Sequence, residues 1–151
     1  MFKDSRRFQR LALNATVKFR QYLDYRNGTY SQQEPIEATA IDVSEGGMGI
    51  QAGISLPQNA FLRIWISLTG INNTGEVIFY GPIEALAKVR WAIPWQEKTF
   101  RFGISFLEMK EEDRQMLKGF INNNIKPREK VIRKIDQASG AVLPFDKDSL
   151  L

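Results

Sequence analysis

The sequence predicts a mainly β domain, a barrel or sandwich of short strands with one helix near the C-terminus. Two observations support this prediction. Apolar residues alternate with polar ones over several short segments, and turns rich in glycine, proline and asparagine separate these segments. After residue 110 the apolar residues recur at helical spacing instead of at every second position.

The first half of the chain contains three expected strands. From Leu11 to Phe19 an apolar residue stands at every second position, which is typical of a strand with one buried face. The Asn27-Gly28 pair that follows favours a tight hairpin. The strands expected here are residues 11 to about 23, 36–43 and 48–51.

The second half contains further strands and the helix. Proline cannot donate a ladder hydrogen bond, so we expect Gly81-Pro82 to separate two strands. Three acidic residues, 111–113, suit the N-terminus of a helix, where the helix dipole favours negative charge. The helix would cap an open end of the β structure with one mainly apolar stripe at helical spacing: Met116, Leu117, Phe120, Ile121 and Asn124. The strands expected here are residues 61–68, 76–80, 83–93 and 100–107.

The composition excludes several classes of chemistry. The 151 residues are 43% apolar and 25% charged, which is typical of one globular domain. Histidine and cysteine are both absent, so a Ser-His-Asp triad, a Cys-His pair and a histidine-bound zinc are excluded. We therefore expect neither catalysis nor a metal site. No apolar run approaches the roughly 20 residues of a membrane helix, and no signal peptide is recognisable, so we expect a cytoplasmic protein.

The positive charge is concentrated at one end of the chain. Residues 1–26 hold seven lysines and arginines against two aspartates, whereas the remaining chain is close to neutral. Proteins that bind long nucleic acids usually spread basic residues over a broad face that follows the phosphate backbone. This distribution favours a compact anionic ligand over a long nucleic acid.

Two short segments carry candidate binding chemistry. The first is Arg6-Arg7-Phe8-Gln9-Arg10, which precedes the first expected strand. The second is Asp42-Val43-Ser44-Glu45-Gly46-Gly47, at the end of the second strand and in the following turn. Taken alone, the first is typical of a solvated arm and the second of an ordinary turn.

In this order the two segments resemble the signatures of the PilZ domain family, Arg-x-x-x-Arg and Asp/Asn-x-Ser-x-x-Gly. Lys88-Val89-Arg90-Trp91 is similar to the strand of that family that ends in Val-x-Trp, and residues 101–107 to its last strand. The resemblance extends from about Arg6 to Asn123. It implies an antiparallel six-stranded PilZ-type β-barrel with a C-terminal α-helix, and a bacterial receptor that binds the second messenger cyclic di-GMP.

The residues suit that ligand, which has two guanines and two phosphates. Arginine pairs bidentately with phosphate or with O6 and N7 of guanine. Asp42 can accept from the Watson–Crick edge of guanine, and Ser44 can add a hydrogen bond, while glycine allows close approach. Trp91 suits packing against a base or ribose, and equally a place in the core. The expected ligand-binding residues are Arg6, Arg7, Arg10, Asp42, Ser44, Gly46, Gly47 and Trp91.

The expected organisation has three parts: a flexible basic arm (1–10), the barrel with its capping helix (11–125), and an extension (126–151) that is loose or partly helical at 128–138. The arm would close over cyclic di-GMP and change the surface offered to an unidentified downstream protein. A homodimer is compatible with the sequence. Two alternatives stay open, a PilZ-like protein-interaction scaffold without nucleotide and a small barrel that binds RNA or single strands.

Overall fold

The computed structural model describes residues 10–124, which contain seven strands and one helix. The expected helix at 128–138 and all of the arm except Arg10 lie outside the described residues. The elements are β1 (Leu11–Asp24), β2 (Thr29–Tyr30), β3 (Ile36–Val43), β4 (Gly47–Ala52), β5 (Phe61–Ile71), β6 (Val77–Pro94), β7 (Phe100–Met109) and α1 (Glu111–Asn124).

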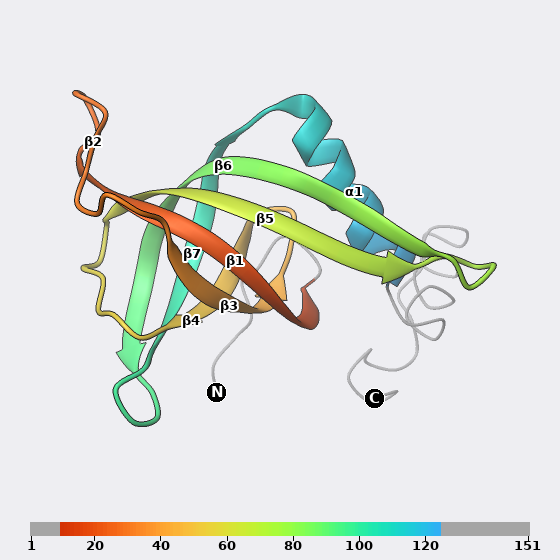
Figure 1. Ribbon diagram of the computed structural model, residues 1–151, viewed down its shortest axis with the longest axis horizontal. Helices are drawn as coiled ribbons and strands as arrows, with labels where there is room; N and C mark the ends of the chain where they lie inside the picture. Colours follow the sequence, from red (N-terminus) through yellow and green to blue (C-terminus); the bar gives the residue numbers. More distant parts are fainter. Residues whose placement is uncertain (1–9, 125–151) are drawn as a thin grey trace, which may run out of the picture.

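Six of the strands form a closed antiparallel ring (Figure 1). The order is β1-β3-β4-β7-β6-β5, and the ring closes because β1 also pairs with β5, from Val17–Ile66 to Gln21–Leu62. The predicted six-stranded antiparallel barrel is therefore confirmed. The two-residue strand β2 pairs with the end of β1 and was not expected from the sequence.

The alternating apolar residues of the strands fill the interior of the ring. Phe19, Met48, Ile64 and Phe102, from four different strands, are each fully buried. The helix adds its apolar stripe to the same core through Leu117, Phe120 and Ile121, as predicted for a capping helix. Its position is fixed at β6, where the Phe120 ring meets the edge of the Tyr80 ring and Asn123 donates a hydrogen bond to the Tyr80 hydroxyl at 2.9 Å.

The expected break at Gly81-Pro82 is wrong, because β6 runs through it as one strand of 18 residues. Ile83 pairs with Ile66 and Tyr80 with Leu68, so the two residues Gly81 and Pro82 stand opposite a single residue of β5. This β-bulge takes proline, which lacks an N–H group, out of the regular ladder. Gly81 has φ of 148°, a value that other residues rarely adopt.

Candidate ligand-binding site

Asp42 belongs to a row of residues that crosses four strands of the barrel. It pairs with Gly49 on β4, Gly49 pairs with Gly103 on β7, and Gly103 pairs with Trp91 on β6. Directly opposed residues of antiparallel strands project from the same face of a sheet. Their chain neighbours Val43, Met48 and Phe102 are buried inside, so this row faces outward. Asp42 and Trp91 thus stand at the two ends of a surface row, roughly 14 Å apart along the sheet.

The two glycines in the middle of the row leave room for the side chains at its ends. A Cβ atom at Gly49 would lie 2.8 Å from Oδ1 of Asp42, and a Cβ atom at Gly103 would overlap the Trp91 indole. Side chains at these positions would therefore displace both ends of the row. The sequence analysis missed Gly49 and Gly103, although a glycine inside a strand pattern signals close approach of another group.

Trp91 lies on the surface of the barrel, with 45% of its area exposed. The alternative prediction, that Trp91 belongs to the core, is therefore wrong. The β-bulge between Val89 and Trp91 explains the difference, because Val89 faces the interior and the extra residue returns Trp91 to the outer face. An exposed indole that rests on a glycine is suited to contact with a planar ligand.

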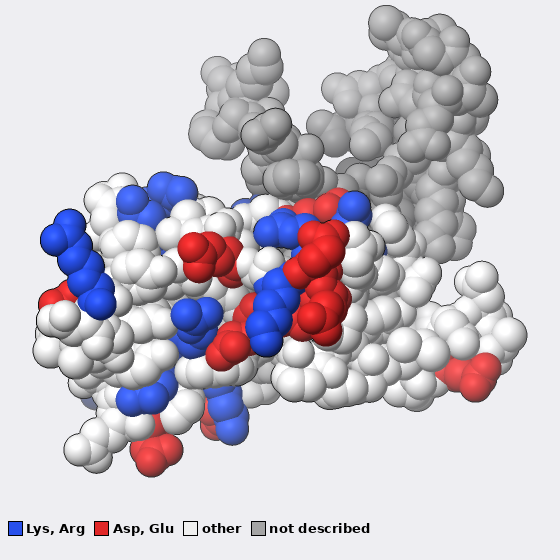
Figure 2. Space-filling model, turned by 90° about the horizontal axis from the view of Figure 1, so that it is seen from above, with Lys and Arg blue, Asp and Glu red and all other residues white. Residues whose placement is uncertain are grey.

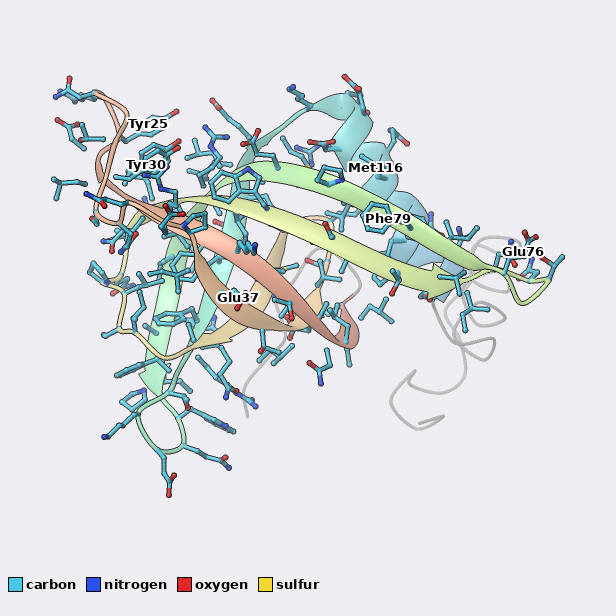
Figure 3. The ribbon with its side chains drawn as sticks, in the orientation of Figure 1. Tyr25, Tyr30, Glu37, Glu76, Phe79 and Met116 are labelled. Atoms are coloured by element: carbon cyan, nitrogen blue, oxygen red, sulfur yellow. The ribbon has the colours of Figure 1, made fainter. Side chains whose placement is uncertain are left out.

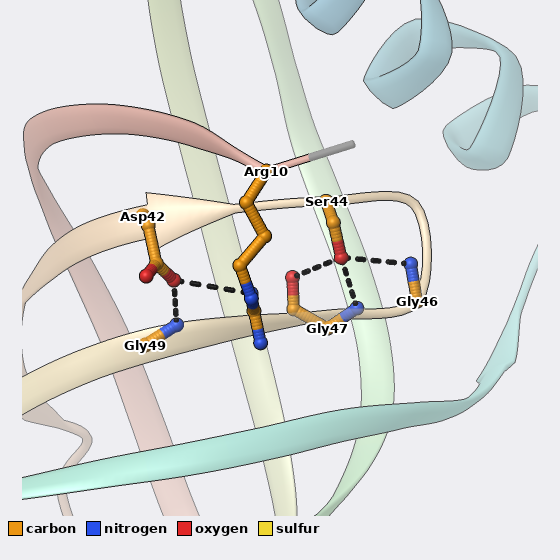
Figure 4. A network of polar contacts seen from close by, with 6 residues as sticks. All are labelled: Arg10, Asp42, Ser44, Gly46, Gly47 and Gly49. Atoms are coloured by element: carbon orange, nitrogen blue, oxygen red, sulfur yellow. Dashed lines mark hydrogen bonds and ion pairs between the residues drawn. The ribbon is translucent and has the colours of Figure 1, made fainter. Parts of the chain in front are cut away.

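Arg10 and Asp42 contact each other at the start of β1 (Figure 4). Nη1 of Arg10 lies 3.1 Å from Oδ1 of Asp42, and the Gly49 amide donates to the same oxygen at 2.8 Å. Within residues 10–124, Oδ2 of Asp42 and the other guanidinium nitrogens of Arg10 have no hydrogen-bond partner. Both side chains are partly exposed, so the atoms without a partner among the described residues are accessible to a ligand.

Ser44 organises the turn between β3 and β4 (Figure 4). Its Oγ accepts hydrogen bonds from the amides of Gly46 and Gly47, both at 3.2 Å, and its backbone amide donates to the Gly47 carbonyl. The side chain is almost fully buried, at 5% exposure. Gly47 leaves no room for a Cβ atom against the Ile104 carbonyl of β7. The serine and the glycine of the second signature therefore shape the turn.

Comparison with known proteins places this chain in a family. Residues 4–123 match the sequence pattern of a family described as "PilZ domain". The chain belongs to the PilZ domain family. No protein with a curated function matches it.

Two solved structures resemble this PilZ domain in fold. The inhibitor of motility MotI/DgrA of Bacillus subtilis has a TM-score of 0.56 at 20% identity, over 78% of this chain and 49% of that one. YcgR of Escherichia coli, in complex with c-di-GMP, has a TM-score of 0.50 at 15% identity, over 89% of this chain and 50% of that one. The chain spans about half the length of each of these proteins.

Two arginines that the sequence analysis did not select flank the row of this PilZ domain. Arg90 donates from Nε to the Ser105 hydroxyl at 2.6 Å, and Arg101 lies over the Trp95 ring at 3.7 Å. Neither forms an ion pair with a carboxylate within the described part of the chain. Both therefore add uncompensated positive charge beside Gly103.

The turn after Asp42 also contacts the rest of the domain. The Phe106 amide of β7 donates to the Gly46 carbonyl at 2.9 Å. Nζ of Lys118, on α1, lies 3.9 Å from Oε1 of Glu45. The turn therefore contacts both β7 and α1.

The described residues place Arg10, Asp42 and the turn together, with Trp91 at the far end of the row. Arg6 and Arg7 lie outside the described residues. Between residues 10 and 124 no group of three or more metal-binding side chains comes together. The helix within that range is too short and too polar to cross a membrane.

Proposed function

We propose that this PilZ domain is a receptor for cyclic di-GMP and catalyses no reaction. The observation that carries the proposal is the row Asp42, Gly49, Gly103 and Trp91, which joins a carboxylate of the PilZ signature to an exposed indole across two glycines. The E. coli protein of similar fold was solved in complex with c-di-GMP, which supports the choice of ligand. The lack of histidine and cysteine supports a receptor over an enzyme.

In this proposal one guanine of the ligand lies along the row. Oδ2 of Asp42, which is free within the described residues, accepts from the N–H groups on the Watson–Crick edge. Trp91 contacts the base or the ribose. Arg10, with Arg6 and Arg7 of the arm, binds phosphate or guanine O6 and N7, because the guanidinium fork matches both. Arg90 and Arg101 raise the positive potential around the phosphates.

Ser44, Gly46 and Gly47 act in this proposal mainly by holding the turn. The Ser44 hydroxyl already bonds the amides of Gly46 and Gly47, so a direct bond to the ligand would compete with those contacts. A rigid turn keeps Asp42 and the end of β3 in place without further ordering when the ligand binds. This pre-organisation reduces the entropic cost of binding.

The signal in this proposal is the ordering of the N-terminal arm. Phosphates compete with Asp42 for Arg10, and the arginines of residues 1–10 close over the ligand. The ligand then supplies contacts that exist only in the closed state, as any population shift requires. The contact between Glu45 and Lys118 gives the turn a route to α1, and the changed surface is read by a downstream protein in the cytoplasm.

Isothermal titration calorimetry of the full chain with cyclic di-GMP tests the proposal. Saturable binding is expected, and the stoichiometry distinguishes one ligand from a stacked pair. A linear guanine dinucleotide is the control, because it keeps the bases and loses the ring. The ligand is added at several hundred micromolar, on the order of the dissociation constant of a weak specific site. If it then produces neither heat of binding nor a rise in the temperature of unfolding, the proposal is overturned.

Calorimetry with these two nucleotides and with a long oligonucleotide separates the two alternatives. A protein-interaction scaffold would bind neither nucleotide, whereas a single-strand-binding barrel would prefer long oligonucleotides with a steep salt dependence. On the face shown in Figure 2, lysine and arginine side chains are interspersed with aspartate and glutamate. That face offers no continuous basic track for a phosphate backbone.

A further inference from the structure

A second surface with binding chemistry lies at the other end of β1. It consists of Arg20, Tyr22, Tyr25, Tyr30, Phe61 and Arg63, and is called here the tyrosine–arginine cluster. Figure 3 shows Tyr25 and Tyr30 close together at the hairpin of β1 and β2, away from the first residue of β1. Tyr25 is 41% exposed, so the cluster is open to a partner.

The aromatic rings of the cluster stack on one another. The Tyr22 and Tyr30 rings lie 4.6 Å apart at 25°, and the Tyr25 and Phe61 rings 5.3 Å apart at 24°. Tyr22 also meets Tyr25 edge-on at 5.2 Å. The guanidinium of Arg20 lies 3.8 Å from the Tyr30 centroid. Many ring faces are thus already used, and what the cluster offers is its polar edges.

Two arginines of the cluster stand directly opposite each other. Arg20 on β1 pairs with Arg63 on β5, an arrangement that is unfavourable for like charges. Neither forms an ion pair with a carboxylate within residues 10–124. The nearby Glu84 accepts instead from the Trp65 indole, with Oε1 at 2.8 Å. The charge of Glu84 compensates Arg63 in part, and an anion between Arg20 and Arg63 would further reduce the repulsion between them.

The hydrogen bonds of the cluster leave donors without acceptors. The Tyr22 hydroxyl oxygen accepts from Nε of Arg63 at 3.1 Å, and the Tyr22 and Tyr30 hydroxyls bond each other at 3.3 Å. One of these two hydroxyl hydrogens therefore has no acceptor within the described residues. Arg20 donates from Nε and Nη2 to the Gln32 carbonyl, which leaves Nη1. The guanidinium of Arg63 also interacts with the Tyr30 hydroxyl, and it forms no ion pair within the described residues. Burial raises the pKa of Tyr22, so its hydroxyl keeps its proton at neutral pH.

We propose that the tyrosine–arginine cluster is the docking site for a partner protein that presents an acidic segment. A carboxylate of this segment binds between Arg20 and Arg63 and accepts from the hydroxyl pair of Tyr22 and Tyr30. Tyrosine and arginine are the residues that most often dominate protein interfaces. A single-stranded nucleic acid fits less well, because it needs free ring faces on which its bases can stack. Arg20 of the cluster lies ten residues along β1 from Arg10.

Titration of the full chain with a blocked hexaglutamate peptide, followed by amide NMR shifts, tests this proposal. Saturable shifts are expected at residues 20–30 and 61–65. Arg63→Lys keeps the charge and loses the planar fork, and Tyr22→Phe keeps the stacking and loses the donor, so each should weaken binding about tenfold. Lys18→Gln is the matched control, because it removes a charge from β1 outside the cluster and should change affinity less than twofold.

Three outcomes would overturn the proposal. The first is the absence of saturable shifts at the cluster. The second is a loss with Lys18→Gln and none with Arg63→Lys, because Arg63→Lys keeps its charge and this pattern would indicate attraction by diffuse net charge. The third is tighter binding of an oligouridylate of equal charge, which would assign the cluster to a nucleic acid. Thermal unfolding of each variant shows whether it is folded, and Tyr22→Phe supplies the test if Arg63→Lys is not.

Discussion

Nη1 of Arg10 lies 3.1 Å from Oδ1 of Asp42, so the two PilZ signatures contact each other directly. The ion pair places an arginine of the first signature beside a carboxylate of the second. Because both side chains are partly exposed, the pair contributes little to stability and is easily exchanged. A ligand with phosphates and guanine N–H groups offers a new partner to each of the two residues.

Replacing Arg10 should therefore weaken cyclic di-GMP binding without unfolding the barrel. A charge-assisted contact contributes roughly 1.5–3 kcal/mol, so Arg10→Ala should raise the dissociation constant at least about tenfold. Calorimetry measures the change. Lys18→Ala, which removes the same charge from the same strand, is the control and should bind normally. An unchanged affinity in Arg10→Ala would remove this arginine from the site.

Asp42 should determine the identity of the base. Guanine presents two N–H donors on its Watson–Crick edge, whereas adenine presents one donor group and an acceptor, so cyclic di-AMP should compete poorly against the natural sequence. Asp42→Ala should narrow the difference by weakening cyclic di-GMP. Competition titrations with both nucleotides test this prediction. Equal competition by both against the unmutated protein would contradict it.

Gly103→Ala tests the contribution of Trp91 without changing Trp91 itself. The new methyl group overlaps the indole and must displace it. Contacts between bases and aromatic side chains contribute roughly 1–3 kcal/mol, so affinity should fall about fivefold or more. The tryptophan fluorescence should also change. Gly53→Ala is the matched control, because a Cβ atom at Gly53 meets nothing within 4 Å. If both variants bind alike, Trp91 does not contact the ligand.

Gly47→Ala should destabilise the barrel, since its methyl group would collide with the backbone carbonyl of Ile104 across the pairing of β4 with β7. Forcing an extra methyl group into packed structure costs about 1–3 kcal/mol. The midpoint of thermal unfolding should fall by several degrees, because a loss of about 1 kcal/mol lowers the midpoint of a domain of this size by a few degrees. Circular dichroism melts of Gly47→Ala and Gly53→Ala make the comparison. Equal unfolding midpoints in the two variants would show that β4 and β7 can move apart at Gly47 with little loss of stability.

Hydrogen exchange tests the proposed switch. Cyclic di-GMP should slow amide exchange across residues 1–10, which would order over the ligand, and across Asp42–Gly47, which the closed arm would cover. The core strands, which carry residues such as Phe19 and Phe102, should change little. If the ligand binds and the amides of residues 1–10 exchange at the same rate as before, the proposed receptor function is retained and the proposed ordering of the arm is contradicted.

Local patterns in the sequence were sufficient for most of the secondary structure. The alternation from Phe100 to Phe106 and the apolar stripe of Met116, Leu117 and Phe120 are read within one element, because side-chain period follows directly from backbone geometry. The two signatures are also local, so Asp42 could be assigned to the end of a strand and Ser44 to the following turn without any tertiary information. The prediction of a break at Gly81-Pro82 was wrong because a β-bulge is defined by the opposing strand. The residue opposite the bulge, Ser67 of β5, belongs to another element of the sequence.

Only the tertiary structure decided which surface residues meet. The chain by itself determined that Asp42, Trp91, Arg20 and Arg63 exist in strands, but their neighbours depend on register. Closure of the ring between β1 and β5 fixes that register, placing Gly103 under Trp91 and Arg20 opposite Arg63. A shift of one residue would turn every side chain of a strand to the other face. Pairings between distant strands are set by burial of the whole core, so no local pattern could reveal either surface.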